Sequence, residues 1–356
     1  MNVVAASPRD LEARPRPVPW RRMAGVTWRQ HRLALAGVAA ALGALAVTLW
    51  ITGTPLHQAW AAAVACHPAS SAACQNLVAN FDSSAPDKFM GSKGAGGVLL
   101  QAVPALIGAF AGAPVLAREL ETGTFRFAWT QGFGRWRWAL AKLVTLPVVL
   151  AAATAALGVL VSWYYQPYLG VSGQDADLYQ NTPFADLFPL REVTFPAWTL
   201  AAFAIAALAG MAIRRVVPAI VATLAAYAGL AFATAGLLRQ HYLTPLVTTS
   251  PNPPATGWII SQWFTRDGRF AFAGNPPVSV FNQLGSCLAA GSGKPLAGGF
   301  PQQQALCLAQ HGYTQWTSYQ PASRLWPFQW IEGGWLLAAS ALLIAATVWL
   351  VQRRAA

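Results

Sequence analysis

The side chains that could carry out chemistry are few in this sequence. Among 356 residues there are 24 Lys and Arg, 12 Asp and Glu, and five His. Four carboxylates cluster in one polar stretch, without a base and a nucleophile at a suitable spacing. We interpret them as solvated loop acids, with an enzyme acting at an outer membrane face as the less favoured alternative: Asp175, Asp177, Asp186 and Glu192.

Two kinds of site are not expected in this chain. The five histidines are scattered, and no spacing of Cys and His resembles a metal site, so we predict no bound metal. A phosphate-binding loop needs Gly-Lys followed by Ser or Thr, whereas Gly293-Lys294 is followed by Pro295. We therefore predict no catalytic residues and no cofactor bound by the chain itself.

The four cysteines form two close pairs in sequence. Cys66 lies near Cys74, and Cys287 lies near Cys307. An oxidising exterior permits disulfides, and pairing within each stretch is the economical arrangement. Four cysteines allow three connectivities, so Cys66–Cys74 and Cys287–Cys307 are preferred pairings and free thiols remain an alternative.

The most informative charged segment covers residues 118–142. Glu119 and Glu121 precede Gly123-Thr124, and aromatic residues alternate with Arg126 and Arg135 after that break. Such a segment could press its charged side chains against a cytosolic partner protein. The simpler alternative is interfacial anchoring by its aromatic and arginine side chains.

The charged and cysteine-containing segments must be positioned by long apolar elements of the chain. Hydrophobic residues make up 55% of the chain and charged residues only 10%, against about 25% in soluble domains. Six blocks of 17 to 23 residues contain no Asp, Glu, Lys, Arg or His. About 20 helical residues cross a bilayer core, so we predict an all-α polytopic membrane protein with six transmembrane helices. The predicted spans are 33–51, 97–117, 143–163, 197–213, 216–238 and 333–351.

The charges divide unevenly between the two sides of these spans. Sixteen basic and four acidic residues lie in 1–32, 118–142, Arg214-Arg215 and the tail 352–356. The loops on the other side contain eight of each sign. Basic residues near span ends stay in the cytoplasm, so we predict cytoplasmic termini in a cell-membrane protein. The long extracellular loops are then 52–96, 164–196 and 239–332. Since the net charge of +12 lies entirely on the cytoplasmic side, no nucleic-acid partner is expected.

The tail before the first span contains an amphipathic pattern. Trp20 and Trp28 recur with other apolar residues at helical spacing, and arginines occupy the opposite face. We predict an interfacial helix on the cytoplasmic side, with both tryptophans as anchors against membrane lipid. A basic tail that only fixes topology is the alternative.

At the 118–142 segment the sequence resembles the permease subunits of ATP-binding-cassette exporters of the second, six-helix type. Those permeases carry glutamates, Gly-Thr, an apolar run, an Arg and a Lys-Leu that opens the third helix. The resemblance extends to the interfacial helix, the Arg-Arg turn and the final helix, and it is closest to actinobacterial permeases. The long 239–332 loop departs from the general pattern. The matching residues are Glu119, Glu121, Gly123, Thr124, Arg135, Lys142 and Leu143.

The resemblance implies a transport function. It implies export of a hydrophobic or amphipathic compound, such as a drug, an antibiotic or a lipid, by a homodimer or with a second permease. ATP would be hydrolysed by a separate cytosolic subunit. The 118–142 segment would include a coupling helix, with Glu119, Glu121, Arg126 and Arg135 as contacts to that ATPase. A membrane sensor with ligand-binding outer loops is the alternative function.

Overall fold

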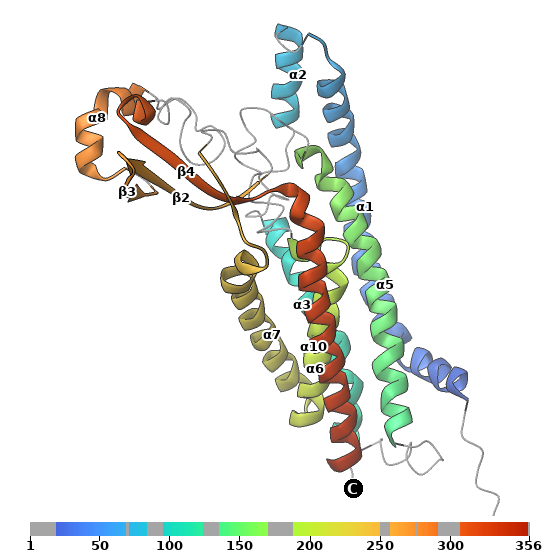
Figure 1. The fold of residues 1–356 in the computed structure, drawn as a ribbon. Helices are drawn as coiled ribbons and strands as arrows, with labels where there is room; N and C mark the ends of the chain where they lie inside the picture. The colour runs from blue at the N-terminus through green and yellow to red at the C-terminus, as the bar shows by residue number, and fades with distance from the viewer. Residues whose placement is uncertain are drawn as a thin grey trace, which may run out of the picture.

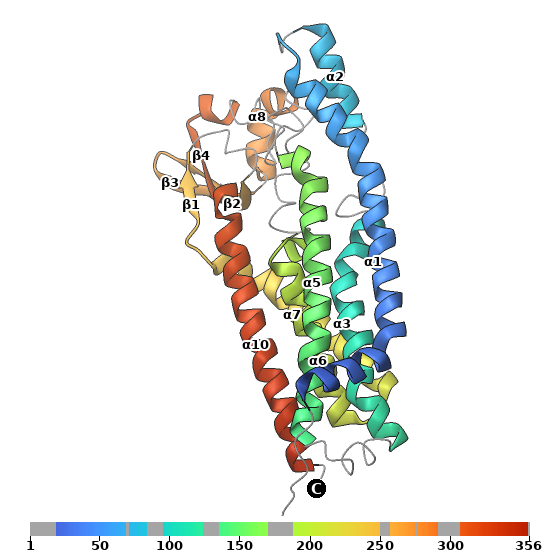
Figure 2. The ribbon, with the colours of Figure 1, turned by 90° about the vertical axis from the view of Figure 1, so that its right-hand side faces the viewer.

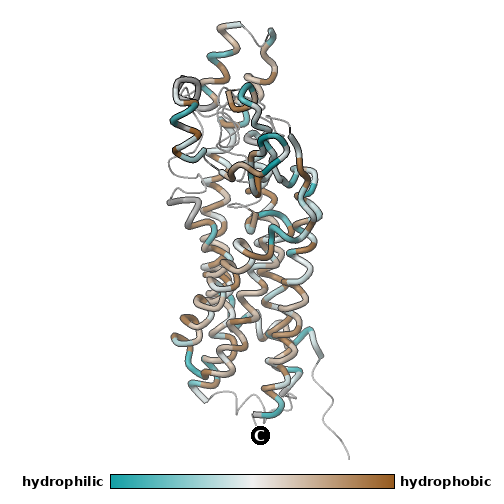
Figure 3. The backbone as a smooth tube through the Cα atoms, turned by 60° about the vertical axis from the view of Figure 1, so that its left-hand side comes forward, coloured by the Kyte–Doolittle hydropathy of each residue, from teal (hydrophilic) through white to brown (hydrophobic). Residues whose placement is uncertain are grey.

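The computed structural model describes most of the chain. The described residues are 19–68, 71–83, 95–123, 135–169, 188–249, 257–274, 276–290 and 307–354. Within them, six helices are long and apolar enough to cross a membrane, and each of these spans coincides with one predicted block, the second span beginning at Leu99 rather than at residue 97. These helices form an upright bundle with apolar residues along its length and hydrophilic residues gathered at its two ends (Figures 1 and 3). The chain is a multi-pass membrane protein.

Long helices run along the bundle, with shorter elements between them (Figure 1). The bounds in chain order are α1 Trp20–Ala65, α2 Ala72–Ser83, α3 Ala95–Thr122 and α5 Arg135–Leu169, then η3 Phe188–Leu190, α6 Thr194–Ile213 and α7 Val216–Ala233. After them come η4 Thr234–Leu238, η5 Arg239–His241, η6 Ala322–Arg324 and α10 Leu325–Arg354. Helices α1, α3, α5 and α10 extend beyond their apolar blocks at both ends, whereas α7 ends at Ala233 and η4 covers the rest of the fifth block.

Helix α6 is the centre of the bundle and packs against α3, α5, α7 and α10. Small residues let α3 approach it closely. A Cβ atom on Gly108 would lie 2.3 Å from the Cβ of Ala202, and one on Gly112 would lie 2.7 Å from the carbonyl oxygen of Phe203. The Gly-x-x-x-Gly pair of α3 thus fits the small-residue face of α6.

Helix α1 is continuous over 46 residues, so the predicted interfacial helix and first span are one element. Its first turns lie across one end of the bundle before the helix turns upward beside α5 (Figure 2). Along the upright part, leucines at every seventh position are buried and belong to the main core with residues of α5. A seven-residue period is the spacing of parallel packed helices. The leucines are Leu35, Leu42, Leu49 and Leu56.

The region 239–332 contains a four-stranded antiparallel sheet, which the sequence reading did not predict. Its order is β1-β4-β2-β3, and its strands are β1 Leu246–Thr248, β2 Trp258–Arg266, β3 Arg269–Ala273 and β4 Tyr313–Gln320. The sheet and α8, Val278–Ala290, project sideways beyond α7, and β4 leads directly into α10 (Figure 1). We call the end of the bundle that carries the sheet the sheet end of the molecule. We call the opposite end, where α3 and α10 finish, the basic end.

The sheet has a hydrophobic core of its own. Phe264 and Phe272 stack on one face, with Leu284 of α8 and Leu308 in the same buried cluster. Strands β2 and β3 are joined by Asp267 and Gly268, which both have positive φ angles. Asp-Gly is the preferred sequence for such a two-residue hairpin turn, so this dipeptide was a sequence signal for the hairpin.

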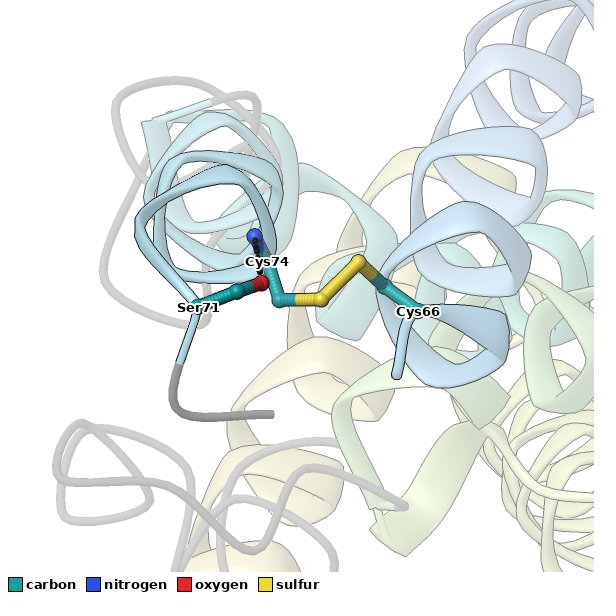
Figure 4. Close-up of a disulfide and its surroundings, with 3 residues drawn as sticks. All are labelled: Cys66, Ser71 and Cys74. Atoms are coloured by element: carbon teal, nitrogen blue, oxygen red, sulfur yellow. Dashed lines mark hydrogen bonds between the residues drawn. A yellow bond between two sulfur atoms is a disulfide. The ribbon is translucent and has the colours of Figure 1, made fainter. Parts of the chain in front are cut away.

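A disulfide joins Cys66, at the end of α1, to Cys74 in α2 (Figure 4). This is the local pairing preferred from the sequence. The backbone N–H of Cys74 donates a hydrogen bond to the Ser71 hydroxyl over 3.2 Å, which caps the first turn of α2. Cys307 is buried and also disulfide-bonded. The side chain of its predicted partner, Cys287, lies outside the described part of α8.

Candidate functional site

The basic end brings the two borders of the 118–142 segment together. The Lys142 ammonium donates to the Glu119 carboxylate, which joins α5 to α3. The Lys142 ammonium also lies 4.6 Å from the ring centroid of Trp138. Lys142 is only 2% exposed, and a buried ammonium needs such partners. The pair therefore holds the end of α3 against the start of α5.

Glu121 is the more accessible of the two predicted carboxylates. Its side chain is exposed, and the Val216 N–H at the start of α7 donates to its Oε2 over 3.4 Å. A carboxylate at a helix N-terminus interacts favourably with the helix dipole. Glu121 thus lies between α3 and the Arg214-Arg215 turn that joins α6 to α7.

The surface of the basic end is formed by segments distant in sequence. Helix α3 ends at Thr122, and Gly123 follows with a φ of 72°, which suits a glycine after a helix. Arg135 opens α5, but its side chain lies outside the described part of the structure, as does Arg126 entirely. Of the four predicted ATPase contacts, the structure therefore describes Glu119 and Glu121.

The two predicted anchors belong to the transverse start of α1. Trp20 is 45% exposed and Trp28 is 53% exposed, whereas Met23 and Thr27 are buried against the bundle. Trp20 makes an edge contact with Trp136 at the start of α5, with ring centroids 6.1 Å apart. Both anchor side chains therefore keep apolar surface available outside the protein.

A buried polar cluster at the sheet end was not predicted. Arg239 donates from Nε and Nη2 to the two carboxylate oxygens of Glu332, each over 3.0 Å. Trp198 of α6 donates to Glu332 Oε1 over 2.9 Å, and Tyr242 donates to Oε2 over 3.2 Å. The guanidinium also lies 4.5 Å from the ring centroid of Phe188. The pair is fully buried, and its hydrogen bonds satisfy both charges.

Short irregular turns bring this cluster together. The π-helical η4 ends α7, and the 3-10 turn η5 places Arg239 inside the bundle. The buried environment and the Glu332 charge raise the pKa of the Tyr242 phenol, which keeps it protonated as a donor. A sequence signal did exist: Arg239 follows the fifth apolar block and Glu332 precedes the sixth, at the same border of two spans.

Of the remaining acids singled out from the sequence, the structure describes only Glu192. Asp175, Asp177 and Asp186 lie outside the described residues, and Glu192 lies in the turn before α6. In the part of the chain that the structure describes, no group of three or more His, Cys, Asp and Glu side chains could hold a metal ion. What the described surface offers at the basic end is a set of charged side chains on joined helix ends, which suits contact with a protein.

One of three comparisons with known proteins found a match. A family model described as "ABC-2 membrane transporter related" matches residues 39–239. The match begins within α1 and ends just after η4, so it includes the whole 118–142 segment. No curated protein matches the chain. No solved structure matches it either.

Proposed function

The chain belongs to the ABC-2 membrane transporter related family, and from this premise we propose that it is the permease subunit of an ABC exporter. An ABC permease-type transport role follows from the family itself. The finer proposal is that the protein moves a hydrophobic or amphipathic compound outward. The energy would come from ATP hydrolysed by a separate cytosolic subunit, because the sequence lacks a phosphate-binding loop.

The observation that carries the proposal is the family match over the first five spans and the segment between α3 and α5. At that segment the Glu119–Lys142 pair ties two helix ends together. A force applied by a partner at the basic end would therefore reach both α3 and α5. We propose that the ATPase subunit binds there, with Glu121 as an accessible contact and Arg126 and Arg135 of the same segment as further contacts.

The proposed orientation follows from the charges. Arg118, Arg214, Arg215 and Arg353 are all exposed at the basic end, which we assign to the cytoplasm. The sheet end then lies outside the cell membrane, where disulfides persist. In the single chain, α1 and α7 are the least enclosed spans. Their exposed faces leave room for a second permease, either another copy or a related chain, and for lipid.

Purification of the tagged full-length protein in mild detergent tests this proposal. We expect an ATP-binding subunit to co-purify at equal stoichiometry. Glu121→Lys should weaken that association about tenfold, because it reverses an exposed charge at the proposed contact. Arg269→Glu is the matched control, since it reverses an exposed charge in the sheet hairpin at the other end.

The sensor hypothesis is favoured by one observation, which is that the sheet and α8 form a folded unit with its own core. The same purification separates the two functions. Absence of an associated ATPase under conditions that preserve the folded protein would rule out the exporter and favour the sensor. Co-purification that Glu121→Lys leaves unchanged would remove Glu121 from the contact.

A further inference from the structure

Three cationic side chains are buried in the described part of the chain, and one of them differs from the others. Lys142 is paired with Glu119, and Arg239 is paired with Glu332. Arg191 is 7% exposed, yet its Nε has no hydrogen-bond partner, and the described residues offer it no ion pair. The adjacent Glu192 is similar, because its Oε2 is buried without a partner. Glu192 acts on Arg191 only as a nearby charge, without an ion-pair contact, so the buried Nε remains unsatisfied, which is costly in an empty site.

Helix α5 supplies a second unpaired group beside this turn. A Cβ on Gly158 would lie 3.3 Å from the backbone carbonyl of Arg191 and 3.4 Å from the Cα of Glu192, so the turn packs directly on α5. Ser162 lies one helical turn further along the same face, and its hydroxyl oxygen is also buried without a partner. Unpaired donors of two types thus come from neighbouring parts of α5 and the α6 entrance.

The location indicates what such donors could bind. Arg191 lies three residues before the start of α6, and Ser162 lies in the last turns of α5, so both are near the border of the membrane-spanning segments. Val159 is three residues before Ser162 and is 58% exposed, and Val148 on the same side of α5 is 62% exposed. A polar border above an exposed apolar helix face suits a molecule with a polar head and an apolar chain.

We propose that the Arg191–Glu192 turn and Ser162 form a binding site for the anionic head of an amphipathic molecule. A phosphate or carboxylate would accept hydrogen bonds from the Arg191 guanidinium and the Ser162 hydroxyl. Glu192 would accept a hydrogen bond from an N–H or O–H group on the same head. The apolar chain would lie along the valines of α5. This inference rests on the proposed function, since it names the chemical class of the transported compound.

Binding of dodecyl phosphate to the purified full-length protein tests the site. In dodecyl maltoside, we expect dodecyl phosphate to raise the melting temperature of the wild type. Arg191→Gln should weaken binding by about tenfold or more, and Arg191→Lys should restore part of it because the charge is retained. Arg215→Gln, at an exposed arginine of the basic end, should bind like the wild type. Equal binding by the wild type and Arg191→Gln would overturn the proposal.

Stability without ligand distinguishes a lost site from a lost fold. Arg191→Gln removes a buried, unpaired charge, so its unliganded melting temperature should equal or exceed that of the wild type. Ser162→Ala is the gentler variant, and it should weaken dodecyl phosphate binding several-fold. If Arg191→Gln fails to fold, unchanged binding by Ser162→Ala would overturn the site, and weakened binding would support it.

Two further arms identify the source of the head group. Inorganic phosphate should bind far more weakly than dodecyl phosphate, and equal binding would overturn the amphipathic ligand. In phosphatidylcholine nanodiscs, added phosphatidylglycerol that competes with dodecyl phosphate would support a membrane lipid as ligand. A lack of competition, with dodecyl phosphate still bound through Arg191, would support a free amphipathic anion. None of these assays needs the ATPase, so a failed site and a failed exporter proposal give different results.

Discussion

At the residue scale, two largely buried ion pairs neutralise charged side chains within an apolar helix bundle. The Glu119–Lys142 pair at the basic end connects residues 23 positions apart, and the Arg239–Glu332 pair at the sheet end connects residues 93 positions apart. Each pair lies where a span meets its border rather than at the membrane centre. There, the pairs can be completed by hydrogen bonds to neighbouring side chains, which lowers the cost of burying charge.

The burial of the Arg239–Glu332 pair predicts how substitutions of these two residues change stability. Arg239→Met should lower stability by about 3–5 kcal/mol, because it leaves the Glu332 carboxylate charged and buried without its counter-charge. Combining it with Glu332→Gln should recover much of that loss, since the neutral amide oxygen can still accept from Trp198. Thermal unfolding in detergent measures both effects. Arg215→Met, which changes an exposed arginine, is the control, and a double variant as unstable as Arg239→Met alone would contradict the pairing.

These sites could be predicted only in part from the sequence. Glu119 and Glu121 could be singled out as candidate partner contacts because they lie two residues apart in the charged and aromatic 118–142 segment. Arg239 and Glu332 are 93 residues apart, and sequence spacing does not reveal a contact between such residues. The burial of Arg191 could not be predicted from the sequence either, because it depends on how the turn before α6 packs against Gly158.

At the scale of helices and strands, the closest packing is between α3 and α6. No hydrophobic effect drives two helices together within lipid, so close contact between small residues supplies the attraction. Gly108 and Gly112 give α3 a flat face, and Ala202 and Ala206 give α6 a matching one. This contact connects the segment that leads to the basic end with the central helix of the bundle.

A single methyl group should disturb that contact. Gly108→Ala would place its Cβ 2.3 Å from the Cβ of Ala202 and 2.7 Å from the Phe203 nitrogen, so the helices must separate. Such overpacking should cost about 1–3 kcal/mol in detergent unfolding experiments. Gly43→Ala is the matched control, because no atom lies within 4 Å of its added Cβ. That control should be neutral or slightly stabilising, and an equal loss in both variants would mean that close α3–α6 packing is unimportant.

The sequence predicted helices more completely than it predicted the sheet. Six uncharged blocks are long, continuous signals, and a bilayer fixes their length, so all six lie within helices of the structure. Their true ends could not be predicted, because residues such as Arg135 and Arg137 continue a helix without belonging to an apolar block. The strands are short, and their pairing depends on residues about fifty positions apart, as with Trp263 and Trp316. Within the sheet, the Asp267-Gly268 turn was a local clue.

At the scale of the whole molecule, the two ends of the bundle differ both in charge and in the structure that they carry. The basic end consists of helix ends and tight turns, whereas the sheet end carries a folded unit with disulfide-bonded Cys307 at its core. In a multi-pass membrane protein, basic groups near span ends favour the cytoplasmic side. In the proposed orientation, the two proposed sites lie on opposite sides of the membrane, with Glu121 inside and Arg191 at the outer border.

This separation predicts which positions can be labelled from outside the cell. Among the residues that the structure describes there is no free cysteine, so an introduced cysteine would provide a distinct reactive thiol. Gln283→Cys on α8 and Arg215→Cys in the α6–α7 turn replace exposed residues at opposite ends of the bundle. A membrane-impermeant maleimide should label Gln283→Cys in intact cells and Arg215→Cys only after permeabilisation. The reverse pattern would place the basic end outside, and with it Glu121, which no cytosolic ATPase could then reach.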